Sequence, residues 1–297
     1  MSNKKIYSRG YRVRKAYWTA FVVMMSYFRL SFLSKIFGEK YYQKRITALH
    51  LKNANRVKTT ILKLEGLFIK VGQLLSILSN FLPEAFQEPL EALQNQIPPR
   101  PYQEIENRIV KELGDKPQNL FAHFDTTPLA SASIGQAHRA TLKNGTQVVV
   151  KVQHANIEKI ADIDLKIIER LTHLTAFFYN IKGIEYAYTQ VEKMIKEELD
   201  FEQEAHAMSV VKENLKNEKG IIIPTVHNEY STNRVLTTTF CKGVKINDLA
   251  KMEAWNIDKK ELGNRLVHAY CQMVFSCLLY TSPSPRDATL SRMPSSA

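Results

Sequence analysis

The stretch "SASIGQAHRATLKNGTQVVVKVQ", residues 131–153, decides the fold. Two β-prone runs flank Asn144 and Gly145, and this dipeptide between such runs is the strongest short signal for a hairpin with a two-residue turn. The second run places Lys151 among valines. Because burying an unpaired ammonium group is costly, Lys151 needs either water or an anionic partner. From the hairpin alone, a lysine on the exposed face of a sheet is the simpler interpretation.

The composition describes a folded and strongly basic chain. Of its 297 residues, 44% are apolar, which is enough for a sizeable core and excludes wholesale disorder. The net charge of +12 indicates an anionic partner, which is a phosphate compound, an anionic membrane or nucleic acid. The three cysteines form no metal-binding pattern, and so few in a chain of this size indicate a reducing compartment.

The N-terminal segment combines basic and aromatic residues. Its uncharged stretch "AYWTAFVVMMSYF", residues 16–28, is shorter than the ~20 apolar residues needed to span a bilayer. No small-residue cleavage site follows it, so it does not resemble a signal peptide. Basic flanks with aromatic residues predict a helix that lies in the headgroup region of an anionic membrane. A helix packed against the rest of the protein is an equal alternative.

Hydrophobic periodicity places helices around the hairpin. The apolar residues of 61–78 fall on one stripe of a single predicted helix, which leaves Lys70 and Gln73 together on its opposite side. Such a pair is usually a solvated face. A proline-rich break follows at 98–101, and the helical pattern after it stops at Gly114, a usual C-terminal cap.

The second half of the chain alternates helical and β-prone segments. Helical spacing predicts helices over 160–180 and within 188–217, the latter with a start near Asp200. A β-branched strand is predicted over 234–240, and "CKGVKI", residues 241–246, is expected to continue it past a glycine.

Three features bear on the role of Lys151. The small-residue loop "ASASIGQ", residues 130–136, precedes the hairpin, and small side chains let backbone amides approach phosphate oxygens. Glu204 lies in the first turn of the predicted helix near Asp200, where it is available to pair with Lys151. The strand at 234–240 then leads to a hinge. Loop, strand lysine, helix glutamate and hinge, in this order, make the nucleotide lobe of a protein kinase.

At these residues the chain resembles the AarF/UbiB family of atypical protein-kinase-like proteins. That family has an alanine-rich loop, here "ASASIGQAH", and a Lys-x-Gly-Gln motif in an N-terminal helical extension, here "KVGQ" at residues 70–73. It also carries a Glu-x-Asp motif before the glutamate partner of the lysine, here within "ELDFEQEA". The resemblance covers about residues 62–275, with four motifs in the expected order.

The resemblance implies a role for each matching residue. Lys151 would bind the nucleotide phosphates, and Glu204 would orient it. Lys70 and Gln73 would reach over the active site, Lys70 meeting Glu198 and Asp200, and so occlude the place of a peptide substrate. The loop that covers the nucleotide would consist of Ala130, Ser131, Ala132, Ser133, Ile134 and Gly135. No protein ligand to a metal ion is assigned.

Asp200 and Glu204 also have simpler, structural interpretations. "DFEQ" is a capping box, in which Asp200 satisfies free amides and Gln203 reaches back to it. Glu204 is also a first-turn carboxylate of the kind that the helix dipole favours. The ordered motifs favour the functional interpretation for Lys151 and Glu204, and for Lys70.

The sequence departs from the family pattern after residue 275. The family places a His-Ala-Asp-Pro-His-Pro-Gly-Asn run and an Asp-Phe-Gly there to hold Mg²⁺, and neither is present. Residues 262–276 look like the helix that leads into the catalytic loop. The Ser- and Pro-rich stretch that follows, residues 276–297, is expected to be non-native or disordered. A genuine pseudokinase ending is the alternative.

We therefore predict an α+β, atypical protein-kinase-like fold, with a helical extension, a small β-rich nucleotide lobe and a large helical lobe that is mostly missing. The predicted domains are a basic membrane-interface segment at 1–50, a helical extension with the KxGQ motif at 51–119, a kinase-like N-lobe at 120–243, the first C-lobe helices at 244–275, and the tail at 276–297.

The resemblance implies an ATP-binding kinase-like protein, an ATPase or small-molecule kinase associated with membranes and the biosynthesis of isoprenoid quinones such as ubiquinone. The implied ligand is ATP or ADP, with Mg²⁺ only in the full-length parent. The expected partners are an anionic membrane surface or isoprenoid lipid and quinone-biosynthesis proteins, at the cytoplasmic inner face of the cell membrane. A non-catalytic regulator or scaffold is the alternative. Nucleic acid is a poor candidate, because no recognised binding module is present.

Overall fold

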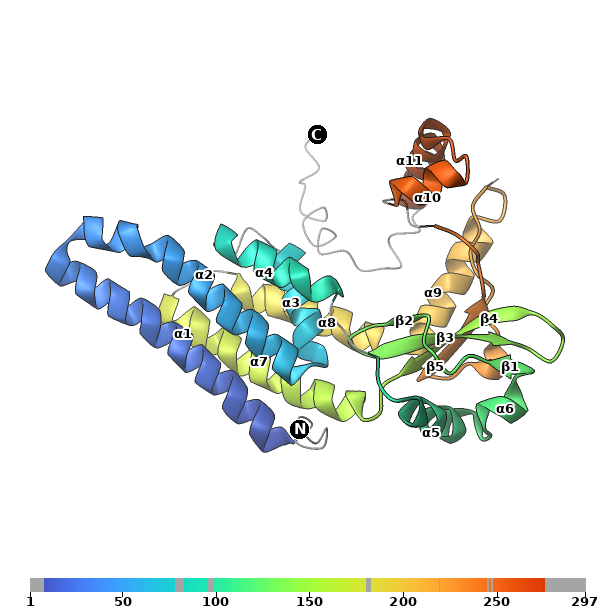
Figure 1. Ribbon diagram of the computed structural model, residues 1–297, viewed down its shortest axis with the longest axis horizontal. Coiled ribbons are helices and arrows are strands. Elements are labelled where there is room, and N and C mark those ends of the chain that lie inside the picture. The colour runs from blue at the N-terminus through green and yellow to red at the C-terminus, as the bar shows by residue number, and fades with distance from the viewer. Residues whose placement is uncertain are drawn as a thin grey trace, which may run out of the picture. The chain divides into compact units, whose positions relative to one another are not determined.

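The computed structural model describes residues 8–77, 83–95, 99–179, 183–218, 220–244, 246 and 248–275 (Figure 1). The chain forms two compact units, each built from discontinuous segments. Unit 1 comprises Met1–Arg108, Thr127–Ala137 and Val152–Leu199, and unit 2 comprises Ile109–Thr126, His138–Lys151 and Asp200–Ala297. The predicted domain boundaries remain predictions, and the predicted tail at 276–297 lies outside the described residues.

Unit 1 begins with a hairpin of two long helices, α1 (Arg9–Phe37) and α2 (Glu39–Leu64), which run side by side (Figure 1). Gly38 joins them with a φ of +81°, a backbone conformation that favours glycine. Within the described chain, α1 is the one helix that is long and apolar enough to cross a membrane. The helix extends beyond the uncharged stretch of residues 16–28 on both sides, and continues through Arg29 to a length of 29 residues.

The predicted continuous helix over 61–78 is wrong. The chain breaks at Glu65 and Gly66, which have φ values of +53° and +58°, and α3 (Leu67–Ile77) starts afresh. A β-carbon at Gly66 would lie 3.3 Å from Cγ2 of Ile160, so the turn packs closely against α7 (Ile157–Tyr179). Tertiary packing therefore overrides a helical pattern that is continuous in sequence.

A buried ion pair explains why the chain turns there. Arg12 of α1 is fully buried and donates from Nε to Oδ1 of Asp164 at 2.7 Å and from Nη2 to Oδ2 at 2.5 Å. Its Nη1 donates to the carbonyl of Leu64 at 2.5 Å, and Nη2 also reaches the carbonyl of Glu65. These are the carbonyls that the end of α2 leaves without helical partners. Burial raises the pKa of Asp164, and Arg12 acts against this rise.

The remaining helices of unit 1 enclose two apolar clusters. One cluster draws on α1, α2, α3, α4 and α7 and on the short helices η3 and η4, and contains Leu64, Ile69 and Leu93 with almost no exposed surface. The other joins α3, α7 and α8 through Leu67, Ala161 and Ile195. The bounds of the further elements are η3 (Glu84–Phe86), α4 (Gln87–Glu91), η4 (Ala92–Asn95), α5 (Tyr102–Leu113) and α8 (Ile184–Glu198).

The sheet follows the order β1-β3-β4-β5, and β2 also pairs with β3. Both β1 and β2 are antiparallel to β3. The strands are β1 (His123–Phe124), β2 (Ala130–Ser131), β3 (Gly135–Thr141), β4 (Gln147–Gln153) and β5 (Val235–Thr239). The α+β fold class is thus confirmed. The predicted continuation of β5 through residues 241–246 is wrong, since no described residue there is in a strand.

The β3–β4 hairpin is confirmed, but its turn differs from the prediction. Gly145 donates to the carbonyl of Leu142 at 2.9 Å, and Leu142 donates to the carbonyl of Thr146 at 2.9 Å. Only Gly145 has a positive φ in this turn, at +85°. A two-residue type I′ turn requires positive φ at both central residues. The connection is therefore a three-residue loop, residues 143–145, with glycine in the left-handed position.

Helices complete unit 2. The predicted cap of α5 is confirmed, because Gly114 has a φ of +85° and donates to the carbonyl of Val110 at 3.0 Å. The helical region within 188–217 divides at Leu199 and Asp200 into α8 and α9. The other bounds are α6 (Pro117–Leu120), α9 (Phe201–Asn214), η5 (Asn228–Tyr230), α10 (Leu249–Ala254) and α11 (Lys259–Phe275).

Replacing Arg12 by methionine is expected to lower the free energy of unfolding by about 3–5 kcal/mol, because Asp164 is left buried without its counter-ion. Chemical denaturation followed by circular dichroism measures this change. The double variant Arg12→Met/Asp164→Leu removes both charges and should recover much of the loss. If the double variant were as unstable as the sum of the single variants, the pair would not act as a unit.

Candidate functional site

In unit 2, Lys151 of β4 forms an ion pair with Glu204 of α9. The Lys151 Nζ lies 2.9 Å from Oε1 and 2.7 Å from Oε2 of Glu204, so the carboxylate holds the ammonium group with both oxygens. The same Nζ lies 4.5 Å from the centre of the Phe201 ring. Val148 and Val150 alternate with Lys151 along β4 and are fully buried. The strand is thus fixed by its valines, and the lysine extends from its other face.

The start of α9 is held by several hydrogen bonds, and this positions Glu204. Asp200 caps the helix by accepting from the backbone amides of Glu202 and Gln203 at 3.1 and 3.3 Å. Asn233 donates to the same carboxylate, and its carbonyl accepts from the amide of Phe201. The capping prediction for Asp200 is confirmed, with one difference: the Gln203 side chain donates to the Asp200 carboxylate instead of accepting from the backbone amide of Asp200.

The Lys151–Glu204 pair contributes little to stability. About a third of each side chain is exposed, at 32% and 36%. Ion pairs at this exposure are worth about 0.2–1 kcal/mol, because water screens them. The arrangement therefore holds a positive charge in a fixed place that solvent and small anions can reach. That is the property that a phosphate-binding lysine needs.

The small-residue loop belongs to unit 1 and is a tight turn between β2 and β3. Ala132 donates to the carbonyl of Gly135 at 2.8 Å, and the side chains of Ser133 and Ile134 are buried. A β-carbon on Gly135 would lie 2.5 Å from the carbonyl oxygen of Val152. Any larger residue at Gly135 would therefore push the turn away from β4. Gly135 thus approaches the neighbouring strand closely, and the expected approach of the loop amides to phosphate stays a prediction.

His154 fastens this loop, and sequence analysis did not identify it. Its backbone amide donates to the carbonyl of Ile134 at 2.9 Å, and its Nε2 lies 3.1 Å from the carbonyl of Ala132. Arg108 of α5 donates to the His154 carbonyl at 2.9 Å. Desolvation, together with the nearby Arg100 and Arg108, lowers the pKa of His154 to about 4. The only signal in the sequence is the position of this histidine directly after β4.

A second ion pair lies within unit 1. The Lys70 Nζ of α3 lies 2.8 and 2.7 Å from the two carboxylate oxygens of Glu198, the last residue of α8. Both side chains are partly exposed. The structure thus brings Lys70 to Glu198, whereas Asp200 caps α9 in unit 2. Gln73 lies on α3, but its side chain is outside the described part of the chain.

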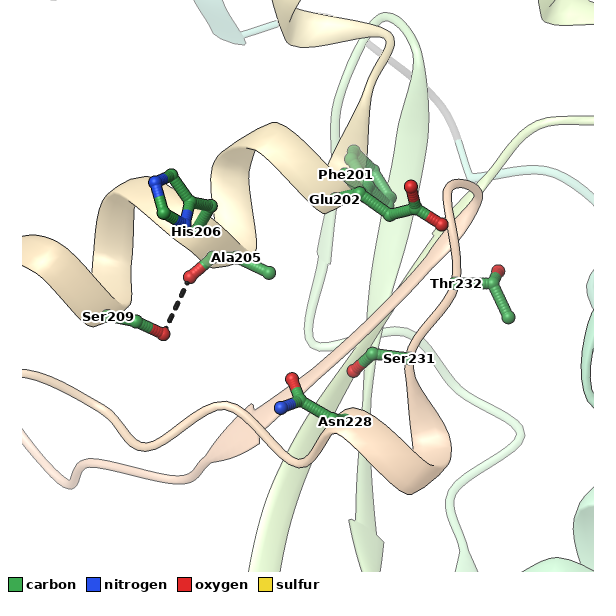
Figure 2. A pocket seen from close by; sticks show the side chains of 8 residues that line it. All are labelled: Phe201, Glu202, Ala205, His206, Ser209, Asn228, Ser231 and Thr232. Atoms are coloured by element: carbon green, nitrogen blue, oxygen red, sulfur yellow. Dashed lines mark hydrogen bonds between the residues drawn. The ribbon is translucent and has the colours of Figure 1, made fainter. Parts of the chain in front are cut away.

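Figure 2 shows a pocket of about 370 Å³ in unit 2, between α9 and the segment from η5 to the start of β5. Its lining residues are Phe201, Glu202, Ala205, His206, Ser209, Asn228, Ser231 and Thr232. Neither Lys151 nor Glu204 lines it. Among the described residues, no group of three His, Cys, Asp or Glu side chains is placed to hold a metal ion. The ion pair, rather than this pocket, is the candidate functional centre.

The lowered pKa of His154 predicts acid sensitivity. Its folded-state pKa of about 4 lies below the ordinary value of 6.5, so the unfolded chain binds the proton more readily. The stability that the neutral ring contributes is present above pH 6.5 and is lost as the pH falls toward 4, by up to about 3 kcal/mol. Denaturation curves of the wild type and of His154→Gln across this range measure the effect.

The comparison with His154→Gln is needed because Asp164 changes the stability in the opposite direction. Its pKa is raised in the folded state, so its contribution favours the folded state as the pH falls. The exposed His206 provides a matched control as His206→Gln. Equal pH dependence in the wild type and in His154→Gln would show that His154 is not held neutral by the fold.

Comparison with known proteins shows to which family the chain belongs. The sequence profile of the ABC1 atypical kinase-like domain matches residues 92–280. The chain is 32% identical over 287 residues to AarF domain-containing protein kinase 1 of Gallus gallus, covering 96% of this chain and 55% of the relative. It is 34% identical over 228 residues to the chloroplastic protein Activity of BC1 complex kinase 8 of Arabidopsis thaliana, covering 75% of this chain and 30% of the relative.

The chain thus spans about half the length, or less, of these curated relatives. The matched region includes the β3–β4 hairpin, the loop before it, the Lys151–Glu204 pair and the helix break at Asp200. The kinase-like arrangement of these elements agrees with the profile that matches them. The chain belongs to the ABC1/AarF family of atypical kinase-like proteins.

Proposed function

We propose that this chain binds ATP or ADP and that Lys151 holds the nucleotide phosphates. The observation that carries the proposal is the two-oxygen contact of Glu204 with Lys151 across β4 and α9. In kinases, a strand lysine held by a helix glutamate grips phosphate oxygens. Here Glu204 holds the ammonium group with two of its three N–H donors, and the partial exposure of Lys151 leaves the third donor available to a ligand. The loop at residues 130–135 enters the proposal through the family resemblance alone.

The whole protein is proposed to be an ATPase or a small-molecule kinase. Mg²⁺ would neutralise the phosphate charge in such an enzyme, and the family holds it with the two motifs that the present sequence does not contain. We therefore expect this polypeptide to bind nucleotide weakly and not to turn it over. Lys70, held by Glu198, is proposed to occlude the place of a peptide substrate, which favours a small acceptor.

The same proposal places the protein at a membrane. Its supports are the long apolar helix α1 and the basic character of the chain. By resemblance, the proposed partners are an anionic membrane surface or an isoprenoid lipid and proteins of quinone biosynthesis such as that of ubiquinone. The proposed location is peripheral, on the cytoplasmic inner face of the cell membrane.

Lys151→Met is expected to weaken nucleotide binding about ten- to a hundredfold, because charge-assisted hydrogen bonds to the phosphates are lost. Isothermal titration calorimetry with ATP and ADP measures this change. Glu204→Gln should cause a smaller loss, since the ammonium group remains but is no longer held. Neither variant should change the free energy of unfolding by more than about 1 kcal/mol.

The matched control is Lys143→Met, which removes an exposed lysine from the turn of the same hairpin. It should leave nucleotide affinity unchanged. Equal affinities of the wild type and Lys151→Met would reject the proposed phosphate contact. Mg²⁺-dependent ATP hydrolysis that disappears in Lys151→Met would instead show that this polypeptide is an active enzyme.

A further inference from the structure

One face of α1 carries a row of exposed apolar side chains. Their spacing of three or four residues places them on a single stripe of the helix. The stripe consists of Trp18, Phe21, Met25, Phe28, Phe32 and Ile36, each between 43% and 64% exposed. A continuous row of large apolar side chains is not normal for a surface in water and indicates an interaction site.

The opposite face of α1 packs against α2 and α7. The Thr19 hydroxyl lies 2.9 Å from that of Thr60, and the Ser26 hydroxyl accepts a hydrogen bond of 2.8 Å from the amide of Asn53. Arg12 on the same face is anchored to α7. For α1 to cross a bilayer, it would have to give up these contacts or take the many charges of α2 with it. Either course costs several kcal/mol. The packing therefore favours a helix α1 that lies parallel to the membrane surface, at the boundary between membrane and water.

A groove of about 770 Å³ is lined by residues of α1 and α2, and its lining includes four members of the stripe: Phe21, Met25, Phe28 and Phe32. Apolar side chains from both helices line it, including Val22, Leu33 and Leu49. Its cationic lining residues are Arg29, Arg45, Lys52 and Arg56. An apolar groove with cations along it suits a ligand that joins a hydrocarbon chain to an anionic group.

The groove cations are available to such a ligand. Glu39 is the only acidic residue of the sequence between Arg9 and Leu64. In the part of the chain that the structure describes, none of the four groove cations forms an ion pair with a carboxylate. The Arg45 guanidinium lies 3.8 Å from the centre of the Tyr41 ring, which orients it without neutralising it.

We propose that the stripe and the groove together form a docking surface for an anionic phospholipid bilayer. In this arrangement α1 lies in the plane of the membrane, its stripe enters the boundary between headgroups and acyl chains, and the groove cations bind lipid phosphates. The inference rests on the membrane part of the proposed function and deepens it. Nucleic acid would satisfy the cations but would leave the apolar stripe in water.

The depth of Trp18 distinguishes a helix in the plane from one that spans. The chain has two tryptophans, so Trp255→Phe leaves Trp18 as the only tryptophan. Its fluorescence is followed with vesicles of equal parts phosphatidylcholine and phosphatidylglycerol that carry bromine at shallow or at deep acyl positions. Strong quenching by shallow bromine and weak quenching by deep bromine is expected. Stronger quenching by deep bromine would indicate insertion and overturn the proposal.

Vesicle flotation tests the two parts of the surface. Phe28→Gln/Phe32→Gln alters the apolar side chains of the stripe, two of which also line the groove, and Arg45→Gln/Lys52→Gln removes two of the groove cations. Each double variant is expected to lower partitioning onto the anionic vesicles about tenfold or more. The matched control, Lys44→Gln/Lys63→Gln, removes the same charge from exposed positions of α2 outside the groove lining, and should lower it less than about threefold. Circular dichroism verifies that each variant is folded.

The outcomes separate this inference from the proposed function. If the wild type does not float with anionic vesicles, the membrane part of the proposed function fails. If it floats and both test variants float equally well, only the surface proposed here is wrong. If the wild type floated equally well with vesicles of phosphatidylcholine alone, the groove cations would have no role in membrane binding, and that part of the proposal would be wrong. A dimer in solution that Phe28→Gln/Phe32→Gln dissociates, or a salt-dependent DNA shift without vesicle binding, would assign the surface to another partner and overturn the proposal.

Discussion

The ion pair of Arg12 and Asp164 is the constraint on which unit 1 depends. A guanidinium without exposed surface has to satisfy its donors inside the protein. Arg12 does so with one carboxylate of α7 and two carbonyls at the end of α2, so a single charge fixes α1, α7 and the turn before α3. The close packing of Gly66 on α7 completes the same junction. The long α1–α2 hairpin is thereby anchored at its base.

The two ion pairs of the candidate site differ from the buried Arg12–Asp164 pair. Lys70–Glu198 and Lys151–Glu204 are both partly exposed, and neither is a major source of stability. Their carboxylates lie on either side of the helix break at Leu199 and Asp200. Glu198 is the last residue of α8 and Glu204 lies in the first turn of α9, so only a short stretch of chain separates the two carboxylates in sequence. The exposed pairs therefore set the positions of charge and do not hold the fold together.

Local signals in the sequence predicted the elements whose ends are determined locally. The Gly114 cap, the β3–β4 hairpin and the Asp200 cap are examples, because each depends on neighbouring residues. The helix break at Gly66 was missed because its cause, Arg12, lies more than fifty residues away. His154 was missed for a similar reason, since its role consists of contacts with a loop twenty residues earlier. The family motifs predicted the Lys151–Glu204 contact, which periodicity alone does not.

The discontinuous make-up of the two units has a practical consequence for dissecting the molecule. Unit 1 takes three separate stretches of the chain, and unit 2 takes the stretches between and after them. Three of the five boundaries between the units fall inside α5, β3 and β4. No single cut in the gene releases either unit. A fragment that ends within the β3–β4 hairpin would lack strand residues of both units. Limited proteolysis or domain-by-domain expression would therefore yield pieces that lack part of their own core. Point substitution in the intact chain is the better way to study the contribution of one unit at a time.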